Sequence, residues 1–511
     1  MLINNGKTGM KENKKVLFII HDLYQDDVEF PLGIGYLAAV LKENGFTVEI
    51  ACQDLFHYSN EELAEKFLIP NDYALIGIGF LSARFKETVL PLCQTVNKYK
   101  KNAKLVLGGQ GATATPEYIL KETQADIIVL GEGEKTIVAL MDNLDDYASV
   151  KGIAYRKENK IIVNERIPPV QNLDELPLPA WELFPMDKYK SSCQYMGQRK
   201  DEYSFPMLTS RGCVGNCSFC YRPERGIRFR SIDNIMYEMK MLLVNYGITY
   251  FIFQDELFIA NLKRLKEFIQ GLKDWKMYGR IKYNMGGIRA NIVTDELARL
   301  LKESGCEYAN VGFEAMDQKC LDAMNKRETV QDNINCAENL KRNGVTMGLN
   351  FIWGFECDDE KTLQNRVKFL RKYNSYSELR TIRPVTPYPS CQLYLDALEK
   401  GYLKDAEDFY NKFKNSDLIM VNFTKIPTDK AYQMLFKANM ELVLDHIKHS
   451  KMSVDEGYNL LKQFFILFFE DQNYKFRGFR KYNKEAEEII KKIVFRDCQF
   501  KGSIVWGKNK K

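Results

Sequence analysis

The sequence predicts an α/β chain of three parts: a doubly wound sheet, a partial (β/α)6 barrel of the TIM type, and a helical C-terminal cap. Two series of β–α repeats predict the first two parts, one from residue 14 to 144 and one from residue 203 onward. A proline-rich stretch separates the two series, and the chain becomes helical and lysine-rich beyond about residue 399. At 511 residues, the chain is too long for one ordinary domain.

Five apolar runs in the first series predict a parallel sheet, because strands buried on both faces read as continuous hydrophobic segments. The runs are VLFII (16–20), TVEIA (47–51), ALIGIGF (74–80), KLVLGG (104–109) and DIIVLGEG (126–133). Amphipathic segments between them predict helices. Most of these strands end in glycine or small polar residues, at the edge where such sheets bind ligands. We therefore expect a large ligand to contact Gly33, Ser82, Gly108, Gly109, Gly131, Glu132 and Gly133.

The segment between the two series reads as a connector. GIAYRKENKIIVN predicts a hairpin with a polar turn, and five prolines between 168 and 185 disfavour regular structure. The expected division is a sheet domain over 1–150, a hairpin and proline-rich linker over 151–202, a partial barrel over 203–398 and a helical domain over 399–511.

Six strand-like runs in the second series predict a parallel barrel or three-quarter barrel. They are FPMLTS, YFIFQDE (250–256), IKYNMGG (281–287), YANVGFEA (308–315), TMGLNFIWGF (346–355) and LRTIRPVTPYP (379–389). Chemistry in such barrels takes place at the carboxyl ends of the strands. The string SRGCVGNCSFCYRP follows the first of these strands, so Cys213, Cys217 and Cys220 are expected at the barrel mouth.

Three thiolates on one short loop suit zinc or an iron–sulfur cluster. Zinc would need a fourth ligand, and no histidine or cysteine follows nearby. A three-cysteine loop leaves one coordination position open, as a catalytic cluster requires. The remaining cysteines of the twelve lack ligand spacing and are expected to be small buried hydrophobes.

Bulk composition excludes several classes of protein. The net charge of +5 is too mild to indicate nucleic-acid binding. The run Val16–Ile20 is too short for a signal peptide, and the best later run, Phe464–Phe469, is far too short to span a membrane. The expected location is therefore the cytoplasm. Because the cytoplasm keeps thiols reduced, the twelve cysteines are not expected to form a disulfide framework.

With its cysteine loop placed, the sequence resembles the radical S-adenosylmethionine superfamily, where C-x3-C-x-aromatic-C holds a [4Fe–4S] cluster whose remaining iron binds S-adenosylmethionine. It resembles in particular the subgroup with an N-terminal Rossmann-like cobalamin-binding domain, over roughly residues 14–395. The shared landmarks are PLGIGYLAAVLKENG (31–45), LGGQGATATPE (107–117), GEGE (131–134), LDELPLPAWEL (173–183), RFRS (228–231), FQDELF (253–258), VGFEA (311–315) and TPYPS (386–390).

The resemblance implies roles for five residues around S-adenosylmethionine. Phe219 would lie against the adenine, and Asp255 and Glu256 would accept hydrogen bonds from the amino group. Arg289 would grip the carboxylate and Glu314 the ribose hydroxyls. The structural alternative for each charged residue is a salt bridge at the barrel mouth.

The cysteine triplet would then be both cluster ligand set and catalytic group, and substrate would lie near the later strands. Trp353, Tyr388 and Cys391 are the candidate substrate contacts there. The two aromatics would serve equally well as core residues.

Cobalamin proteins that place a histidine on cobalt carry the motif D-x-H-x-x-G. None of the four histidines lies in such a motif. Cobalamin is therefore expected base-off, with no protein histidine on cobalt. Gln110, in the segment after the fourth strand, is a further candidate contact.

The resemblance implies reductive cleavage of S-adenosylmethionine to a 5′-deoxyadenosyl radical. The leading hypothesis is cobalamin-dependent methyl transfer to an unactivated carbon or phosphorus centre of a small molecule. Oxidative cyclisation, ring contraction or rearrangement with the same cofactors is the alternative, and a non-catalytic cobalamin-binding sensor is the alternative outside enzymes. The reduction step implies a low-potential electron donor such as a flavodoxin or ferredoxin, and no nucleic-acid partner is expected.

Overall fold

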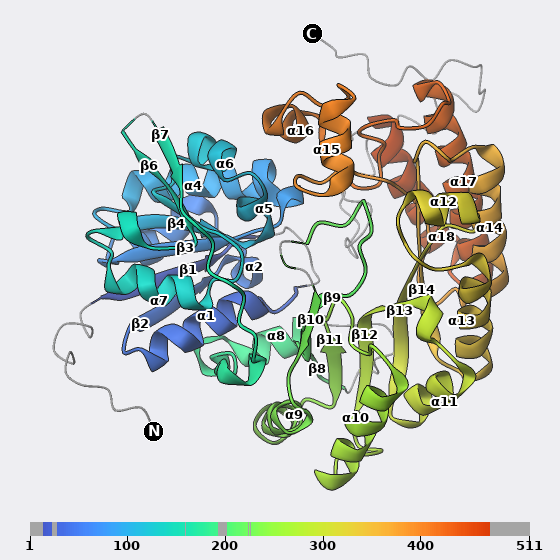
Figure 1. Ribbon diagram of the computed structural model, residues 1–511, viewed down its shortest axis with the longest axis horizontal. Helices are drawn as coiled ribbons and strands as arrows, with labels where there is room; N and C mark the ends of the chain where they lie inside the picture. Colours follow the sequence, from blue (N-terminus) through green and yellow to red (C-terminus); the bar gives the residue numbers. More distant parts are fainter. Residues whose placement is uncertain are drawn as a thin grey trace.

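The computed structural model describes residues 14–22, 28–158, 160–192, 202–222, 224 and 226–470. Two α/β units lie side by side, the N-terminal sheet on one side and the barrel on the other, with the C-terminal helices along the barrel and above the junction (Figure 1). No helix in these ranges is long and apolar enough to cross a membrane.

A seven-stranded sheet forms the N-terminal unit, in the order β2-β1-β3-β4-β5-β6-β7. The first five strands are parallel, as the apolar runs predicted. Their order reverses between β1 and β3, and this reversal opens a crevice at the carboxyl edge of a doubly wound sheet. The strands are β1 (Lys15–Ile20), β2 (Thr47–Cys52), β3 (Leu75–Gly79), β4 (Lys104–Gly108), β5 (Ile127–Val129), β6 (Ile153–Lys157) and β7 (Lys160–Val163).

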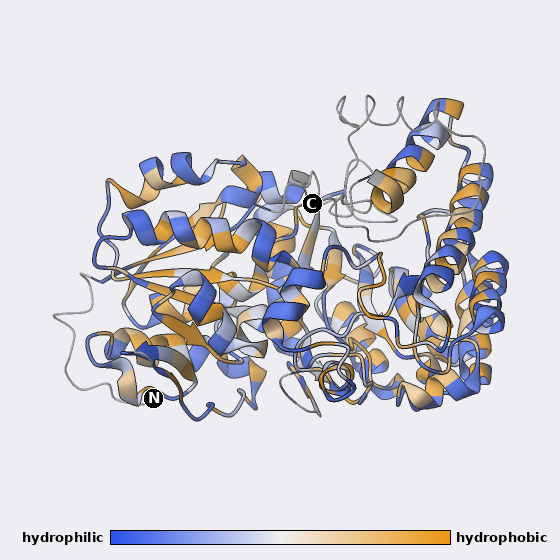
Figure 2. Ribbon diagram, turned by 90° about the horizontal axis from the view of Figure 1, so that it is seen from above, coloured by the Kyte–Doolittle hydropathy of each residue, from blue (hydrophilic) through white to orange (hydrophobic). Residues whose placement is uncertain are grey.

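Helices cover both faces of this sheet, and Figure 2 shows hydrophobic strands enclosed by helices that are hydrophilic on the outside. This layering buries the strand side chains on both faces, which explains their continuous apolar sequence. The helices are α1 (Leu32–Glu43), α2 (Gln53–Phe56), α3 (Asn60–Leu63), α4 (Leu90–Tyr99), α5 (Gly109–Ala114), α6 (Pro116–Thr123) and α7 (Glu134–Asp142).

The predicted hairpin is present as β6 and β7, and it extends the N-terminal sheet. Ile153 pairs with Val129 of β5, and the two hairpin strands run antiparallel to each other. The proline-rich connector that follows carries α8 (Met186–Ser192). The local pattern indicated a hairpin, but it held no information about which strand the hairpin would join.

The second unit is an open six-stranded parallel sheet in the order β15-β14-β13-β12-β11-β8, which confirms the partial barrel. The last strand is only two residues long, far shorter than the run 379–389, because prolines at 384, 387 and 389 cannot donate to a ladder. The strands are β8 (Ser204–Met207), β11 (Tyr250–Phe253), β12 (Lys282–Ile288), β13 (Cys306–Glu314), β14 (Thr346–Trp353) and β15 (Arg383–Pro384).

Six helices cover the outer face of the barrel. Side-chain caps mark where several of them begin, as at Thr329 and Asp359, which each form a capping box with the residue three positions on. The helices are α9 (Ile232–Tyr246), α10 (Leu262–Asp274), α11 (Asp295–Glu303), α12 (Gln318–Ala323), α13 (Val330–Arg342) and α14 (Glu360–Tyr373).

A two-stranded antiparallel ribbon stands at the barrel mouth and was not predicted. It consists of β9 (Ser210–Cys213) and β10 (Gly226–Phe229), and Cys213 is its last residue on β9. The ribbon therefore carries the start of the cysteine loop.

The described part of the C-terminal segment, residues 399–470, is helical as predicted and contacts both units. Residues 471–511 of the predicted helical domain lie outside the described residues. Asn439 of α17 exchanges two hydrogen bonds with the backbone of Ile382 in the barrel. Tyr410 of α16 stacks on Tyr118 of the N-terminal unit, with ring centroids 5.2 Å apart. The helical end thus bridges the two units. Its helices are α15 (Gln392–Glu399), α16 (Ala406–Lys412), α17 (Thr428–His449) and α18 (Val454–Phe465).

Candidate functional site

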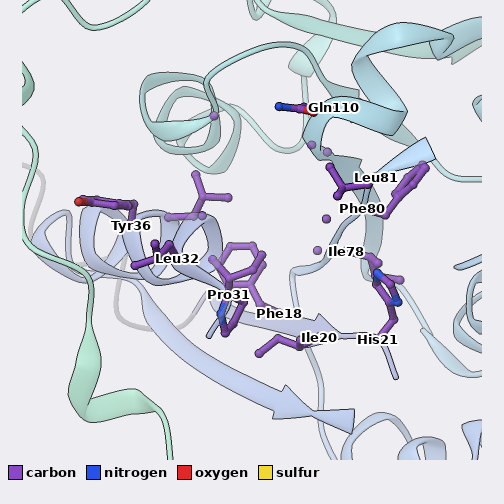
Figure 3. Close-up of a pocket in the computed structure, with 18 of the residues that line it drawn as sticks. Phe18, Ile20, His21, Pro31, Leu32, Tyr36, Ile78, Phe80, Leu81 and Gln110 are labelled. Carbon is purple, nitrogen blue, oxygen red and sulfur yellow. The ribbon is translucent and has the colours of Figure 1, made fainter. Parts of the chain in front are cut away.

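A cavity of about 980 Å³ lies at the carboxyl edge of the N-terminal sheet. Its lining comes from β1, α1, β3, β4 and the turn before α7, and it includes Leu208, Arg211, Gln254 and Glu378 from the barrel side. Figure 3 shows the apolar side chains that line it, among them Phe18, Ile20 and Ile78. The cavity therefore opens where the two units face each other, and its size is at the upper end for ligand pockets.

The structure brings together most of the residues predicted at this edge. Ser82 is the exception, because it lies outside the lining, beside the hydroxyl of Tyr410. The predicted residues that line the cavity are Gly33, Gly108, Gly109, Gln110, Gly131, Glu132 and Gly133.

The glycines of this edge serve two different purposes. Gly109 has φ +85° and sits against the backbone of Phe80, so its conformation and its neighbour both require glycine. A Cβ on Gly33 would meet nothing within 4 Å, so this glycine leaves open space above α1. A wide, mostly apolar cavity with bare glycine backbone fits a large flat cofactor such as a corrin.

His21 lines this cavity and was not predicted as a contact. The hydroxyl of Thr88 lies 3.0 Å from His21 Nδ1 and 3.0 Å from the carbonyl oxygen of Arg84. Burial lowers the pKa of His21 to about 4, so the imidazole is neutral at pH 7. Its position directly after the first apolar run, at the carboxyl end of a predicted strand, could have identified it as a cavity residue. The absence of a protein histidine on cobalt stays a prediction. His21 is the histidine of the cavity lining whose replacement would test it.

The cysteine loop is held by backbone hydrogen bonds to two distant segments. The amide of Ser218 donates to Met324 (2.9 Å), and the carbonyl of Ser218 accepts from the amide of Leu393 in α15 (2.9 Å). Asn325 donates its side-chain amide to the carbonyl of Asn216 (2.8 Å). The loop conformation is therefore fixed by the barrel and by the C-terminal helices together.

The three loop sulfurs do not converge on one point. In the described part of the chain, the group whose ligand atoms all lie within 4.8 Å of one another is Cys320, Cys357 and Asp358, and the loop cysteines are spread more widely. A single tetrahedral zinc would hold its sulfurs about 3.8 Å apart, given Zn–S bonds of about 2.3 Å. The loop is therefore not a closed site for a single metal ion, whereas cysteines that bind different irons of a cluster need not lie so close together.

The tight group around Asp358 is a hydrogen-bonded part of the core. Asp358 accepts the thiol hydrogen of Cys320 (3.3 Å) and pairs with the buried Arg366 (2.9 Å). It also accepts from the backbone amides of Gly354 and Phe355 (2.9 and 3.1 Å). Because its oxygens are already used, this group does not resemble a metal site.

A buried charged network surrounds the cysteine loop and includes two of the predicted S-adenosylmethionine contacts. Arg289 Nε lies 3.1 Å from Glu328, and its NH2 donates to the carbonyl of Lys326 at 2.5 Å. Lys326 Nζ lies 3.6 Å from Glu314 and 3.8 Å from Glu328. Lys326 and Glu328 escaped prediction because they lie in a loop without a motif. The network positions Arg289 and Glu314 beside the cysteines.

Two details of this network favour a ligand. Arg289 NH1 forms no hydrogen bond with any described residue and lies 2.7 Å from where a Cβ of Gly215 would stand. Glycine at position 215, between Cys213 and Cys217, therefore leaves room for the guanidinium. Glu314 has φ +61°, a left-handed conformation that is costly for a side-chain-bearing residue and is typical of functional sites.

Asp255, which was expected to serve the ligand amino group, makes several hydrogen bonds within the chain. Its carboxylate accepts from the amides and hydroxyls of Thr209 and Ser210, at 2.5 to 3.0 Å. Burial raises its pKa to about 6, against these hydrogen bonds. Asp255 thus holds the turn between β8 and β9, while Glu256 beside it is exposed and electrostatically coupled to Cys220.

The remaining predicted residues divide between core and site. Trp353 is fully buried and donates its ring N–H to the carbonyl of Asp359 (3.3 Å), so it occupies the core position that the sequence left open. Phe219 packs edge-on against Phe355, with centroids 6.2 Å apart.

Tyr388 packs against Phe409 and Phe413 of the α16 segment. Cys391, before α15, is buried and electrostatically coupled to Cys220.

The chain combines a glycine-lined cavity at the edge of a doubly wound sheet with a three-cysteine loop at the mouth of a parallel barrel. The model of the Radical SAM superfamily matches residues 207–370, and that of the B12 binding domain matches residues 26–141. The chain belongs to the radical SAM enzymes that carry an N-terminal B12-binding domain. Its cofactors are a [4Fe–4S] cluster, S-adenosylmethionine and cobalamin.

Known proteins resemble the chain over most of its length. An uncharacterized methyltransferase of Pyrococcus horikoshii is 28% identical over 425 residues, 81% of this chain and 88% of the relative. An anaerobic magnesium-protoporphyrin IX monomethyl ester cyclase of Rubrivivax gelatinosus is 28% identical over 456 residues, 82% of this chain and 78% of the relative. The structure of the apo cobalamin-dependent S-adenosylmethionine radical enzyme OxsB matches with a TM-score of 0.66 at 18% identity, covering 94% of this chain and 75% of that one.

Proposed function

We propose that this protein is a cobalamin-dependent radical S-adenosylmethionine methyltransferase that acts on a small polar molecule. The observation that carries the proposal is the cavity shared by the sheet edge and the barrel. Residues of both units line it, Gly109 and Glu132 from one side and Arg211 and Glu378 from the other. A cofactor bound on the sheet edge would therefore face the barrel interior directly.

The chain supplies the ligands and the enclosure for this chemistry. When bound, the cluster and S-adenosylmethionine supply a 5′-deoxyadenosyl radical, and cobalamin supplies a methyl group. Cys213, Cys217 and Cys220 would hold the cluster. Arg289 and Glu314 would bind the carboxylate and the ribose, and Phe219 would lie against the adenine. With substrate and cofactors bound, the barrel and the bridging C-terminal helices would shield this space from water.

Arg289→Lys is expected to weaken S-adenosylmethionine binding about tenfold, because lysine keeps the charge but loses the planar fork that grips a carboxylate through two bonds. Lysine still pairs with Glu328, so folding should be preserved. Binding is measured by equilibrium dialysis on the cluster-loaded enzyme, with Arg342→Lys on the barrel surface as the control. Equal affinity in the two variants would remove Arg289 from the binding site.

The inner face of the barrel indicates the kind of substrate. Asn350 of β14 donates its side-chain amide to Asn310 of β13 (2.8 Å), and Arg380 bonds with both Tyr308 and Glu378. These groups offer hydrogen bonds and charges along the strands. They favour a small polar substrate over a large apolar macrocycle.

A second reaction, oxidative cyclisation with the same cofactors, is favoured by the likeness to the Rubrivivax gelatinosus cyclase. The polar barrel interior supports methyl transfer to a smaller molecule instead. For either reaction we propose a low-potential electron donor, such as a flavodoxin or ferredoxin. We also propose a cytoplasmic location, where reducing conditions protect the cluster.

Methyl transfer predicts an outcome that needs no substrate. The enzyme loaded with cluster and reduced cobalamin, given S-adenosylmethionine and a low-potential reductant, should release about one S-adenosylhomocysteine per bound cobalamin, besides slow 5′-deoxyadenosine formed by electron transfer through the cluster. Both products are measured by liquid chromatography and mass spectrometry, with cobalamin-free enzyme as the control. If 5′-deoxyadenosine alone were formed, methyl transfer would be excluded and cyclisation would become the leading reaction.

A further inference from the structure

Four charged residues pair across the two units beside the shared cavity. Glu132 was expected to contact the cofactor, but no role was assigned to Glu134, Arg211 or Arg228, or to the pairing of the four. Arg211 and Arg228 belong to the β9–β10 ribbon at the barrel mouth, and Glu132 and Glu134 belong to the turn that starts α7 of the N-terminal unit. We name these four residues the arginine clamp.

The contacts of the arginine clamp are close and mutually reinforcing. Glu132 receives two bonds from the Arg228 guanidinium, at 2.5 and 3.0 Å, and lies 3.6 Å from Arg211. Arg211 also bonds to Glu134 at 2.6 Å. One carboxylate oxygen of Glu132 additionally accepts the backbone amide of Val170 (3.0 Å), so the connector is tied in as well.

Burial makes these ion pairs stronger than surface pairs. The side chains of Arg211 and Glu132 are each 17% exposed, those of Arg228 and Glu134 11% and 7%. The Arg211 guanidinium also lies over the ring of Tyr36 in α1, 5.1 Å from its centroid. Burial opposes ionisation of Glu132, but the two arginines outweigh it and hold its pKa below the ordinary value. Charged groups this enclosed resist displacement, because separating them would leave a buried charge unpaired.

The ribbon transmits this anchor to the cysteine loop. Arg228 pairs with Arg211 across the ribbon, and Gly226 pairs with Cys213 in the same register. Arg211 and Cys213 are two residues apart on one strand, which is about 7 Å. Cys213 therefore lies at one end of a short, hydrogen-bonded ribbon. The arginines of this ribbon are bound to the turn that lines the cavity.

We propose that the arginine clamp is a positioning device that fixes the distance between the cobalamin cavity and the cluster loop. In this role Arg211 and Arg228 act through Cys213 on one side and through Glu132 and Glu134 on the other, and Arg211 also lines the cavity. The reason for fixing this distance rests on the proposed function, since in methyl transfer the radical and the methyl donor must reach the same substrate atom. The effect of the arginine clamp on the distance can be measured without catalytic turnover.

Electron paramagnetic resonance measures this distance directly. A reduced [4Fe–4S] cluster is paramagnetic and speeds the relaxation of a nearby Co(II) centre, whereas the oxidised cluster is diamagnetic and does not. In Arg228→Gln, with both cofactors bound in full, we expect much of this relaxation enhancement to be lost. Arg342→Gln, which removes an exposed arginine paired with Asp295 at 2.8 Å on the barrel surface, should keep it.

Two further variants keep the proposal open to disproof. Arg228→Lys retains the charge and protects folding if the glutamine variant is unstable; we expect it to lose part of the enhancement. Arg211→Lys, on the neighbouring strand of the ribbon, should also lose part of the relaxation enhancement. Wild-type enhancement in these variants, with cofactors bound, would overturn the proposal. The measurement needs no methyl transfer, so an absence of S-adenosylhomocysteine would count against the proposed function and leave the arginine clamp as it stands.

Discussion

Replacing Cys217 with alanine is expected to remove the iron–sulfur cluster and to lower 5′-deoxyadenosine formation by about 100-fold or more. The two remaining thiols cannot hold a cluster that needs three protein ligands and an open iron. Cys217 also lies at the centre of the charged network, coupled to Lys326, Glu314 and Arg289. Iron and sulfide analysis, visible absorption and product quantification measure the effect.

The matched control is Cys336→Ala, which removes a buried thiol from α13, outside the cysteine loop. This variant should keep its cluster and its activity, at a small cost in stability. Unchanged cluster content in Cys217→Ala would contradict the assignment of the loop. It would also revive the possibility of a non-catalytic cobalamin-binding protein.

Gly33→Phe is expected to weaken cobalamin binding by about 10- to 100-fold while leaving the cluster intact. Because a Cβ at this position meets nothing within 4 Å, the new ring would enter the cavity without displacing the backbone. Gly33 lies within α1, where phenylalanine is a better helix former than glycine. The variant should therefore fold, cleave S-adenosylmethionine and form almost no S-adenosylhomocysteine.

Cobalamin titration followed by absorption measures this effect. Glu43→Phe adds the same ring at the exposed end of the same helix, outside the cavity, and should bind cobalamin normally. Wild-type affinity in Gly33→Phe would show that the corrin does not occupy this part of the sheet edge.

Local sequence determined a large part of this fold. The five apolar runs identified the parallel strands of the first sheet, since burial on both faces leaves a continuous hydrophobic signature. The second series gave the open barrel, although its last strand is shortened to Arg383–Pro384. The hairpin at 153–163 was identified, but its pairing with β5 was not, because register depends on a partner distant in the chain.

The predicted site shows the same division. Spacing alone placed three cysteines on one loop, and glycines at strand ends indicated the cavity edge, because both signals lie within a few residues. Asp255 was correctly placed at a strand end, yet its hydrogen bonds go to Thr209 and Ser210, 46 and 45 residues away in the chain. The direction of a side chain at a barrel mouth depends on such neighbours.

The sequence by itself determined the two β–α series, the three-cysteine loop and the glycine-rich strand ends, since each depends on short-range spacing or periodicity. Only the tertiary structure decided how the two sites face each other. It placed His21 in the cavity, Lys326 beside the cysteines and Arg228 against Glu132, a pair 96 residues apart. Such contacts form only when the units pack together, because charges need a buried partner to be held in place, and no local pattern specifies that partner.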